Sequence, residues 1–324
     1  MKTFILAFCL FIAAVAACSA EIPVHTYSIV ARDPETGEMG VAVQSHYFSV
    51  GSVVPWAEAG VGAVATQSFV EVSYGPLGLE LMKAGKTAPQ ALQSLLAADD
   101  ARDVRQVAMI DAEGNVAVHT GKKCIADAGH ISGKNYSVQA NLMANDRIWP
   151  AMSQAFENAK GTLAERMLAA LEAAQKAGGD IRGEQSAAML IVSGKRTGVW
   201  WKDRLLDLRV EDNPHPLPEM RRLLRIHEAY RHEDRGDGFI AEKNLPAALK
   251  EYEAAAQLAP DNDELLFWYA VGVYTAGDEK KALDLFKQVF DRDPRWIELV
   301  DRLPASDLLP AEAVSKIKSA GKTH

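Results

Sequence analysis

The sequence predicts two domains, an α+β domain followed by an all-α domain of helical repeats. Up to residue 210, short runs of small and β-branched residues are interrupted twice by pairs of helical segments. Three prolines follow within residues 213–218, and beyond them the apolar residues have helical spacing in a pattern that repeats. A length of 324 residues suits two domains, and 48% hydrophobic with 24% charged residues is typical of globular proteins.

The N-terminal segment predicts an exported protein. Residues 4–17 are apolar, follow a single Lys2 and end in small residues, which is typical of a secretory signal. This run is too short for a membrane-spanning helix, which needs about 20 residues. We assign residues 1–20 to the signal. Two ways of processing the signal stay open. One is ordinary cleavage after Ala20, and the other is lipidation of Cys18, because the residues before Cys18 resemble a bacterial lipobox. The expected location is the periplasm of a Gram-negative bacterium or a lipid anchor on its outer membrane.

The first half of the α+β domain contains two hairpins and one helix pair. Residues 33–37 carry turn-forming residues between two strand-like runs, and residues 111–115 do the same further along. The small apolar run at 61–67 predicts a strand buried on both faces. Thr87 is the expected N-cap of a helix with Pro89 in its first turn. Strands are expected at 26–32, 39–45, 61–67, 104–111 and 116–120, and helices at 75–84 and 87–97.

The second half of this domain continues the alternation. A strand is expected near 136–142, followed by helices at about 146–159 and 161–177. A last strand pair is expected at 186–194 and around 199–203. Runs of strands interrupted by helix pairs favour two sheets packed together and covered by helices over a doubly wound sheet. The strand-to-helix junctions also lack the glycine-rich loop of phosphate- and dinucleotide-binding folds.

The all-α domain carries an internal repeat. The three prolines predict a stiff, extended linker over 213–218. After it, apolar and proline positions recur at a spacing of 34 residues, and a helix–turn–helix period of this length is the signature of tetratricopeptide repeats. The matched positions are Ala248, Leu249, Tyr252 and Pro260, which recur as Ala282, Leu283, Phe286 and Pro294. We therefore assign 219–324 to such repeats, with capping helices near 218–231 and 310–320, and expect a protein partner to bind them.

Charge and motif spacing argue against several classes of function. The net charge of −8, without a basic patch, argues against nucleic-acid binding. The histidines show no metal-ligand spacing: His227 and His232 are five residues apart, not the four that place two ligands on one helical face. We expect no metal and no cofactor. Cys124, the one cysteine beyond the signal, has no partner for an internal disulfide. Although adjacent lysines can lower the pKa of a thiol, a structural role is favoured for it over catalysis.

Four segments of the first domain carry a family resemblance. They are residues 26–67, SYGPLGLELM at 73–82, RQVAMIDAEGNVAVHTGKKC at 105–124 and AGHISGKNYSVQAN at 128–141. Together they resemble a bacterial and archaeal family of unknown function, the one numbered 1028 and classed as N-terminal-nucleophile (Ntn) hydrolase-like. The resemblance covers about residues 24–212. It implies a four-layer αββα sandwich, in agreement with the order of elements.

The resemblance also implies a nucleophile. In Ntn hydrolases a Thr, Ser or Cys that begins the mature chain attacks an amide carbonyl, and its own α-amine, with a pKa of about 7.7–8.0, is the base. Thr26 is the matching position, at the start of the first expected strand. Residues 22–25 precede Thr26, and neither way of processing the signal frees the amine of Thr26. A further cut between His25 and Thr26 is therefore required. An ordinary strand threonine is the alternative.

Further positions match family-typical motifs and have groups that suit substrate binding or an oxyanion. These candidates are Ser28, Ser45, Thr66, Gln67, Thr120 and Asn141. Ser45, Thr66 and Gln67 rank highest, because two neighbouring buried strands end in polar groups there. Ala140 stands where the family usually has glycine, and its methyl group narrows any pocket beside Asn141.

These observations predict an exported amide hydrolase or peptidase that acts on a small amide or peptide and has a protein-binding helical tail. The alternative is a catalytically inactive binding or scaffold module of the cell envelope. A free Thr26 amine distinguishes the two predictions. A homo-oligomer is compatible with either.

Overall fold

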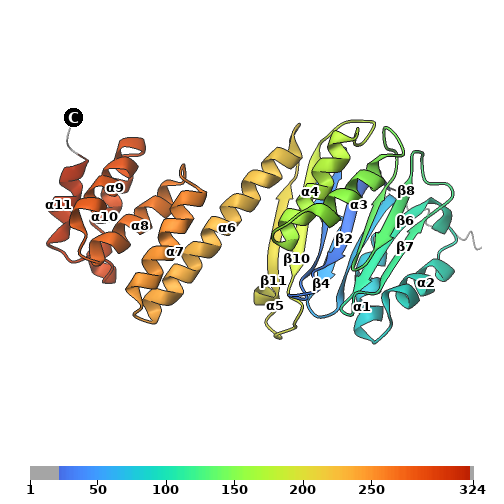
Figure 1. Cartoon of the computed structure of the whole chain (residues 1–324), viewed down its shortest axis with the longest axis horizontal. Helices are drawn as coiled ribbons and strands as arrows, with labels where there is room; N and C mark the ends of the chain where they lie inside the picture. Colours follow the sequence, from blue (N-terminus) through green and yellow to red (C-terminus); the bar gives the residue numbers. More distant parts are fainter. Residues whose placement is uncertain (1–21, 322–324) are drawn as a thin grey trace, which may run out of the picture.

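The computed structural model describes residues 22–321 of the chain. The expected signal segment, including Cys18 and both cleavage positions, lies outside the described residues. Figure 1 shows a mixed α/β domain and a helical region that are joined by one long helix. Within the described range, no helix is both long and apolar enough to cross a membrane.

The first sheet is antiparallel and has a strand of small residues at its centre. Its order is β1-β5-β6-β7, and β4 pairs with β5 on the same edge as β1, opposite β6. Its strands are β1 (Ile22–Val24), β4 (Pro55–Glu58), β5 (Gly62–Val70), β6 (Arg105–Asp111) and β7 (Val116–Thr120). Because β5 carries small side chains, it can be covered on both faces, and it is buried almost throughout, as the sequence predicts.

The second sheet is also antiparallel, in the order β11-β10-β3-β2-β9-β8. Its strands are β2 (Thr26–Arg32), β3 (Met39–Ser45), β8 (Gly129–Gly133), β9 (Tyr136–Ala140), β10 (Ser186–Val192) and β11 (Arg204–Val210). The expected turn at 33–37 joins β2 to β3. There the Asp33 carboxylate accepts hydrogen bonds from the main-chain N–H groups of Glu35 and Thr36, at 2.8 and 3.0 Å, which is how aspartate stabilises tight turns.

The two sheets pack face to face, and a pair of helices lies on the outer face of each (Figure 1). α1 (Tyr74–Lys83) and α2 (Ala88–Ala98) cover the first sheet, and α3 (Ile148–Asn158) and α4 (Leu163–Lys176) cover the second. Residues between the sheets include Val30, Val41, Val43, Ala63, Ala65 and Ile110. Thr87 caps α2 as expected, because its side chain accepts a hydrogen bond from Gln90 N–H. The predicted arrangement of two sheets covered by helices is confirmed.

Three short strands and one short helix depart from the prediction. β1 and β4 have three and four residues, too few for a side-chain period to show in the sequence, and two of the five residues of β8 are glycines, which are not typical of strands. The run at 199–203, expected as a strand, forms the helix α5 (Trp200–Asp203), and β11 begins only after it. The side chains of Trp200 and Trp201 are both exposed, so burial does not favour a strand at this position.

The extended linker predicted at 213–218 is wrong in its second half. α6 (Pro216–Ala241) begins at the second of the three prolines, because a proline in the first turn of a helix needs no N–H partner. Leu217 is buried in the core between α4 and the second sheet. Near the other end of α6, Gly236 lies against the ring of Tyr252 in the following helix. One continuous helix therefore belongs to both parts of the molecule (Figure 1).

The helical region beyond α6 is built around the repeated positions. Its helices are α7 (Leu245–Leu258), α8 (Asp263–Thr275), α9 (Glu279–Arg292), α10 (Trp296–Val300) and α11 (Ala313–Ala320). The equivalent alanine and aromatic positions of the two units are buried: Ala248, Tyr252, Ala282 and Phe286. Phe267 of α8 contacts the rings of Phe286 and Trp296 at centroid distances of 5.5 and 5.0 Å. These aromatic side chains fill the space between helices.

Enlarging the repeated alanines should destabilise the helical region. Ala248 and Ala282 are fully buried, so leucine at either position overpacks a helix contact and should lower the free energy of unfolding by about 1–3 kcal/mol. Urea unfolding measures this change, with Ala311→Leu as the control because Ala311 is exposed. Unchanged unfolding midpoints in both core variants would contradict close helix packing at these positions.

Candidate active site

Thr26 lies at the start of β2 with its side chain between the two sheets. Alternate residues of a strand face opposite sides, and Val30, four residues on, belongs to the core between the sheets. Thr26 is fully buried, and its Oγ1 donates a hydrogen bond to the Val24 carbonyl oxygen at 3.1 Å. In this structure Thr26 follows His25 in the chain and has no free amine.

The residues before Thr26 are part of the fold. β1 pairs with the end of β5, in the register Ile22 to Val70 and Val24 to Ser68. His25 follows β1 and is buried, with Nδ1 2.8 Å from Asn141 Oδ1. Burial lowers the pKa of His25, so the imidazole is held in its neutral form at neutral pH. This segment therefore occupies a defined place beside Thr26.

The carbonyl group of His25 receives two hydrogen bonds. Ser45 Oγ donates to this oxygen at 2.5 Å, and Arg182 Nη2 donates to it at 2.7 Å. The guanidinium is held by the buried carboxylate of Asp180, through Nε to Oδ1 at 3.0 Å and Nη2 to Oδ2 at 2.6 Å. One of the two donors is thus cationic and fixed in place. Such donors stabilise negative charge that develops on an oxygen during amide cleavage.

A buried polar network holds Thr26 from the other side. Gln67 of β5 donates through Nε2 to the Thr26 carbonyl oxygen at 3.2 Å and to Gln106 Oε1 at 2.7 Å. Its Oε1 accepts from Ser28 Oγ at 2.6 Å, and that hydroxyl accepts in turn from Gln139 Nε2, also at 2.6 Å. All of these side chains are fully buried. Because the network crosses from one sheet to the other, it fixes the position of Thr26 relative to β5 and β6.

The network continues from one histidine to another. Asn141 Oδ1 accepts a hydrogen bond from His25 Nδ1, and Asn141 Nδ2 donates to Gln106 Oε1 at 2.9 Å. Gln106 Nε2 donates to Thr120 Oγ1 at 2.9 Å, and Thr120 Oγ1 lies 2.9 Å from His130 Nδ1. Removing one member of such a network leaves its buried partners without hydrogen bonds. This lowers the stability of the fold by about 1–3 kcal/mol for each neutral group.

The structure brings six of the seven predicted site residues together. Thr26, Ser28, Gln67, Thr120 and Asn141 belong to the network, and Ser45 reaches the His25 carbonyl. Thr66 does not join them. It is adjacent to Gln67 in β5 and therefore faces the helix side of the sheet, where its Oγ1 donates to the Glu71 carbonyl oxygen at 3.0 Å. The placement of Thr66 in the site is corrected, since two successive strand residues cannot face the same side.

Sequence reasoning missed five residues of this region: His25, Gln106, Gln139, Asp180 and Arg182. A signal existed for the two glutamines. Gln106 is separated from the buried Ala108 and Ile110 by two and four residues, so all three side chains face the same side of the strand. A polar side chain at Gln106 was therefore expected to face the core between the sheets. Asp180 and Arg182 lie in the segment between α4 and β10, where no strand period could indicate their direction.

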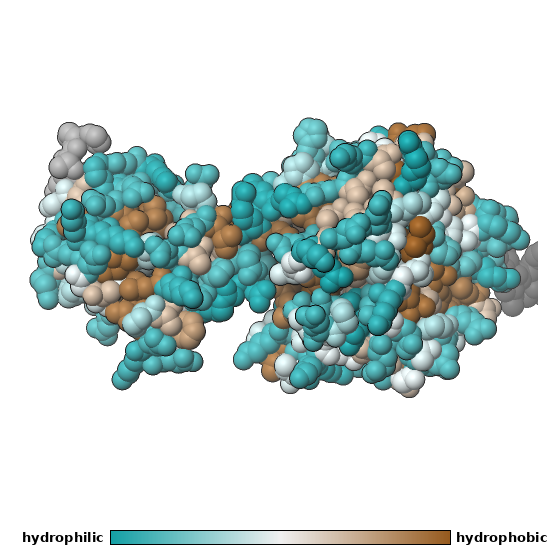
Figure 2. Space-filling view, viewed as in Figure 1, coloured by the Kyte–Doolittle hydropathy of each residue, from teal (hydrophilic) through white to brown (hydrophobic). Residues whose placement is uncertain are grey.

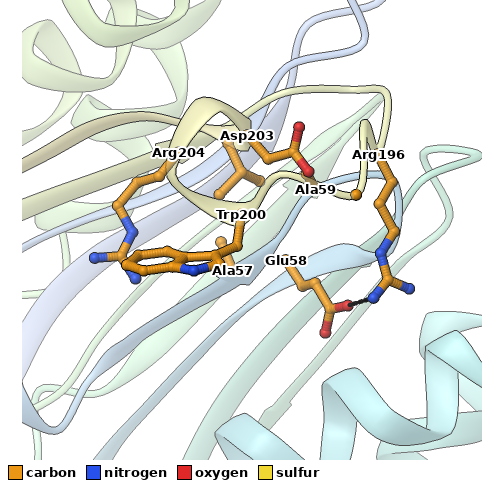
Figure 3. A pocket seen from close by; sticks show the side chains of 9 residues that line it. Ala57, Glu58, Ala59, Arg196, Trp200, Asp203 and Arg204 are labelled. Carbon is orange, nitrogen blue, oxygen red and sulfur yellow. Dashed lines mark ion pairs between the residues drawn. The ribbon is translucent and has the colours of Figure 1, made fainter.

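A hollow in the surface lies at the other end of the sheets from Thr26 (Figure 3). It has a volume of about 180 Å³, and its walls include the Glu58–Arg196 ion pair at 3.6 Å and the indole of Trp200, which is 65% exposed. Arg204 lies over this indole, 5.6 Å from the ring centroid. Among the described residues that line the hollow, there is no serine, threonine or cysteine. Without a nucleophile it is a weaker candidate for covalent catalysis than the Thr26 site.

The Cys124 thiol is not activated as a nucleophile. Burial raises the pKa of the Cys124 thiol, and its Sγ lies 3.3 Å from the Arg105 carbonyl oxygen, so the thiol is protonated at neutral pH. This outcome favours the structural role expected for Cys124. Among residues 22–321, no group of three or more His, Cys, Asp or Glu side chains could hold a metal ion.

The helical region has its own groove, with a volume of about 370 Å³. Trp268 and Val271 of α8 and the exposed Ile240 of α6 supply apolar walls, and Glu233 and Asp237 of α6 add carboxylates. Figure 2 shows apolar patches between polar side chains over this part of the molecule. Burial, together with Glu264 and other nearby acids, raises the pKa of Glu233 to about 7.

Together the fold and the site define an α/β domain of two facing sheets, with a buried threonine at their end, followed by helical repeats. Residues 26–220 match a family model described as a family of unknown function (DUF1028), and the chain belongs to this family. The match begins at Thr26, so β1 precedes it. Residues 239–305 match a tetratricopeptide repeat model, and such repeats suggest binding of a protein partner.

A solved structure is similar to much of this chain. It is protein SPO2555 from Silicibacter pomeroyi, described with the same DUF1028 family model, at 29% sequence identity and a TM-score of 0.56. The similarity covers 62% of this chain and 88% of that protein. No curated protein matches the chain.

Proposed function

We propose that the first domain is an amide hydrolase of the Ntn type, with Thr26 as its nucleophile, and that it frees Thr26 by cutting its own chain after His25. The observation that carries this proposal is the pair of donors, Ser45 Oγ and Arg182 Nη2, on the carbonyl oxygen of the peptide bond before Thr26. Two donors on one carbonyl polarise it and stabilise an oxyanion. In this proposal the facing sheets and their outer helices form the four-layer αββα sandwich of Ntn hydrolases.

The proposed cut uses the hydroxyl of Thr26 as the nucleophile. Thr26 Oγ1 attacks the His25 carbonyl carbon through a five-membered ring, the carbon–nitrogen bond breaks, and the hydroxyl proton passes to the nitrogen that becomes the α-amine. The product is an ester between the His25 acyl group and Thr26 Oγ1. Water then hydrolyses this ester, which releases a peptide ending in the His25 carboxylate and restores the hydroxyl.

The same groups would serve an external substrate after the cut. The free α-amine of Thr26, with a pKa of about 7.7–8.0, becomes the base that activates Oγ1. Arg182 stays in place as a donor to the substrate carbonyl because Asp180 holds its guanidinium, and Ser45 stays in place as the last residue of β3. Gln67 keeps the Thr26 main chain fixed through its carbonyl oxygen. The substrate class is a small amide or peptide.

The N-terminus of the purified protein tests this proposal. Intact mass and N-terminal sequencing over time should show a chain that comes to begin at Thr26, and this chain should hydrolyse members of a broad amide and dipeptide panel. A chain expressed from Thr26 should be active without a lag. If the native protein keeps residues 22–25 and the chain expressed from Thr26 is inert across the panel, the domain is the catalytically inactive binding module instead.

We further propose that the protein is exported and, before the cut, anchored by lipid at Cys18 or released by cleavage after Ala20. The apolar run at residues 4–17 supports this proposal. Growth with a labelled fatty acid should mark the protein if Cys18 is lipidated, and the mature chain should otherwise begin at Glu21 or Thr26. A full-length chain that begins at Met1 and fractionates with the cytosol would contradict export.

A further inference from the structure

We infer that the site freed by the cut takes an extended peptide, which adds as a strand to β5 and places a histidine side chain where His25 now lies. This inference rests on the proposed function and names the substrate class of the same site. Its basis is that β1 and His25 already occupy the acyl side of the bond that Thr26 is proposed to cleave. The segment before a scissile bond lies where a substrate's acyl side must lie.

The first element of this site is the edge of β5. β1 pairs with Ser68–Val70 of β5, and β4 pairs with the same edge only as far as Ala65. When β1 leaves, the main-chain groups of Ser68–Val70 lose their partners, and unpaired strand edges of this kind bind extended peptides as added strands. Because β4 covers the rest of the edge, the free stretch is three residues long. It therefore suits a short peptide or an exposed chain end.

The second element is the pocket around His25. The imidazole is buried, its edge meets the ring of Phe69 at a centroid distance of 5.5 Å and 87°, and its Nδ1 lies 2.8 Å from Asn141 Oδ1. Asn141 Nδ2 donates to Gln106 Oε1, so Oδ1 is the atom left to face the pocket. An oxygen there accepts a hydrogen bond and requires a donor from the ligand. A neutral imidazole with its proton on Nδ1 satisfies this requirement, and a leucine of similar size leaves the oxygen unpaired.

The third element ties this pocket to the chemistry. The carbonyl of the residue in the pocket is the one that Ser45 and Arg182 contact, at 2.5 and 2.7 Å. A peptide that pairs with β5 and seats a histidine beside Asn141 therefore presents the carbonyl of that histidine to both donors and to Thr26 Oγ1. Selection by the pocket and placement of the scissile bond depend on the same bound pose.

The test uses the sequence that now fills the site. Acetyl-Ile-Pro-Val-His-p-nitroanilide and its Leu analogue are compared on the mature chain that begins at Thr26. We expect kcat/KM to be about tenfold higher for the His anilide, the value of one hydrogen bond to an otherwise unpaired group. In Asn141→Leu this ratio should fall to about one, whereas Asn141→Asp, which keeps an acceptor oxygen, should retain it. Unfolding midpoints show whether each variant is folded.

Binding without turnover separates this inference from the proposed function. Acetyl-Ile-Pro-Val-His with a free carboxylate is titrated calorimetrically into the chain that begins at residue 26 and carries Thr26→Ala, with the Leu peptide as control. Tighter binding of the His peptide supports the inference even if no anilide is hydrolysed. Hydrolysis of both anilides at equal rates, with equal or no binding of the two peptides, overturns the inference and leaves the hydrolase proposal standing. Absence of both hydrolysis and binding overturns both.

Discussion

Replacing Thr26 with alanine should leave the chain uncut between His25 and residue 26. The attacking oxygen is then absent, although β1, His25 and both carbonyl donors keep their places. The expected effect is a complete loss of self-cleavage, measured by intact mass over days. A chain expressed from residue 26 with this change should also hydrolyse no amide, because its free α-amine has no hydroxyl to activate.

Two further variants make this result specific. Thr26→Ser should retain part of the cleavage, since a hydroxyl remains at the same position. Thr66→Ala is the matched control: Thr66 is equally buried, but its hydroxyl bonds to the Glu71 carbonyl on the other face of β5. The Thr66→Ala variant should have a free energy of unfolding that is lower by about 1 kcal/mol, and it should cut at the wild-type rate. Cleavage of Thr26→Ala at the wild-type rate would mean that another protease makes the cut or that Thr26 is only a strand residue.

Removing either carbonyl donor should slow the cut strongly. Ser45→Ala leaves the His25 carbonyl with Arg182 alone, and Arg182→Met leaves it with Ser45 alone. Loss of one oxyanion donor typically reduces a rate by about 10²–10³, and we expect this range for each variant. Rates are measured by intact mass on freshly purified precursor, after circular dichroism has confirmed the fold.

Ser186→Ala is the matched control for Ser45→Ala. Ser186 lies opposite Ser45 in β10 and is also fully buried, but its hydroxyl donates to the Tyr47 carbonyl oxygen. It should therefore cut at nearly the wild-type rate. If Ser45→Ala and Arg182→Met also cut normally, the two hydrogen bonds only stabilise the fold around β1, and the observation on which the proposed function depends has no catalytic meaning.

The prediction of strands and helices succeeded where a pattern extended over at least five residues. β2, β3, β6 and β7 have enough alternating or continuous apolar residues to stand out, and the 34-residue period identified the repeats. It failed where the pattern was short or ambiguous. β1 has three residues, and the tryptophan pair at 200–201 is as compatible with a strand as with the short helix that it forms. Pro216 is likewise ambiguous in the sequence, because proline is common both in extended linkers and in the first turn of a helix such as α6.

The candidate site was predicted in part. Ser28 and Gln67 were named because they match family motifs, and Gln67 also because it is a polar residue near the end of a buried strand; both face the space between the sheets. Thr66 was included wrongly, since its neighbour Gln67 takes the inward position. The resemblance pointed to Thr26, but the sequence offered no reason to give the residues before it a place in the first sheet.

The sequence by itself determined the local structure, the two-part organisation and the repeat, because side-chain period and turn chemistry act between residues close in the chain. Only the tertiary structure decided what surrounds the bond before Thr26. Arg182 is 157 residues from His25 along the chain, and Asn141 is 116 residues away. Hydrogen bonds over such separations depend on how the two sheets and the loop after α4 pack together. No period in the sequence encodes that packing, and the proposed chemistry rests on it.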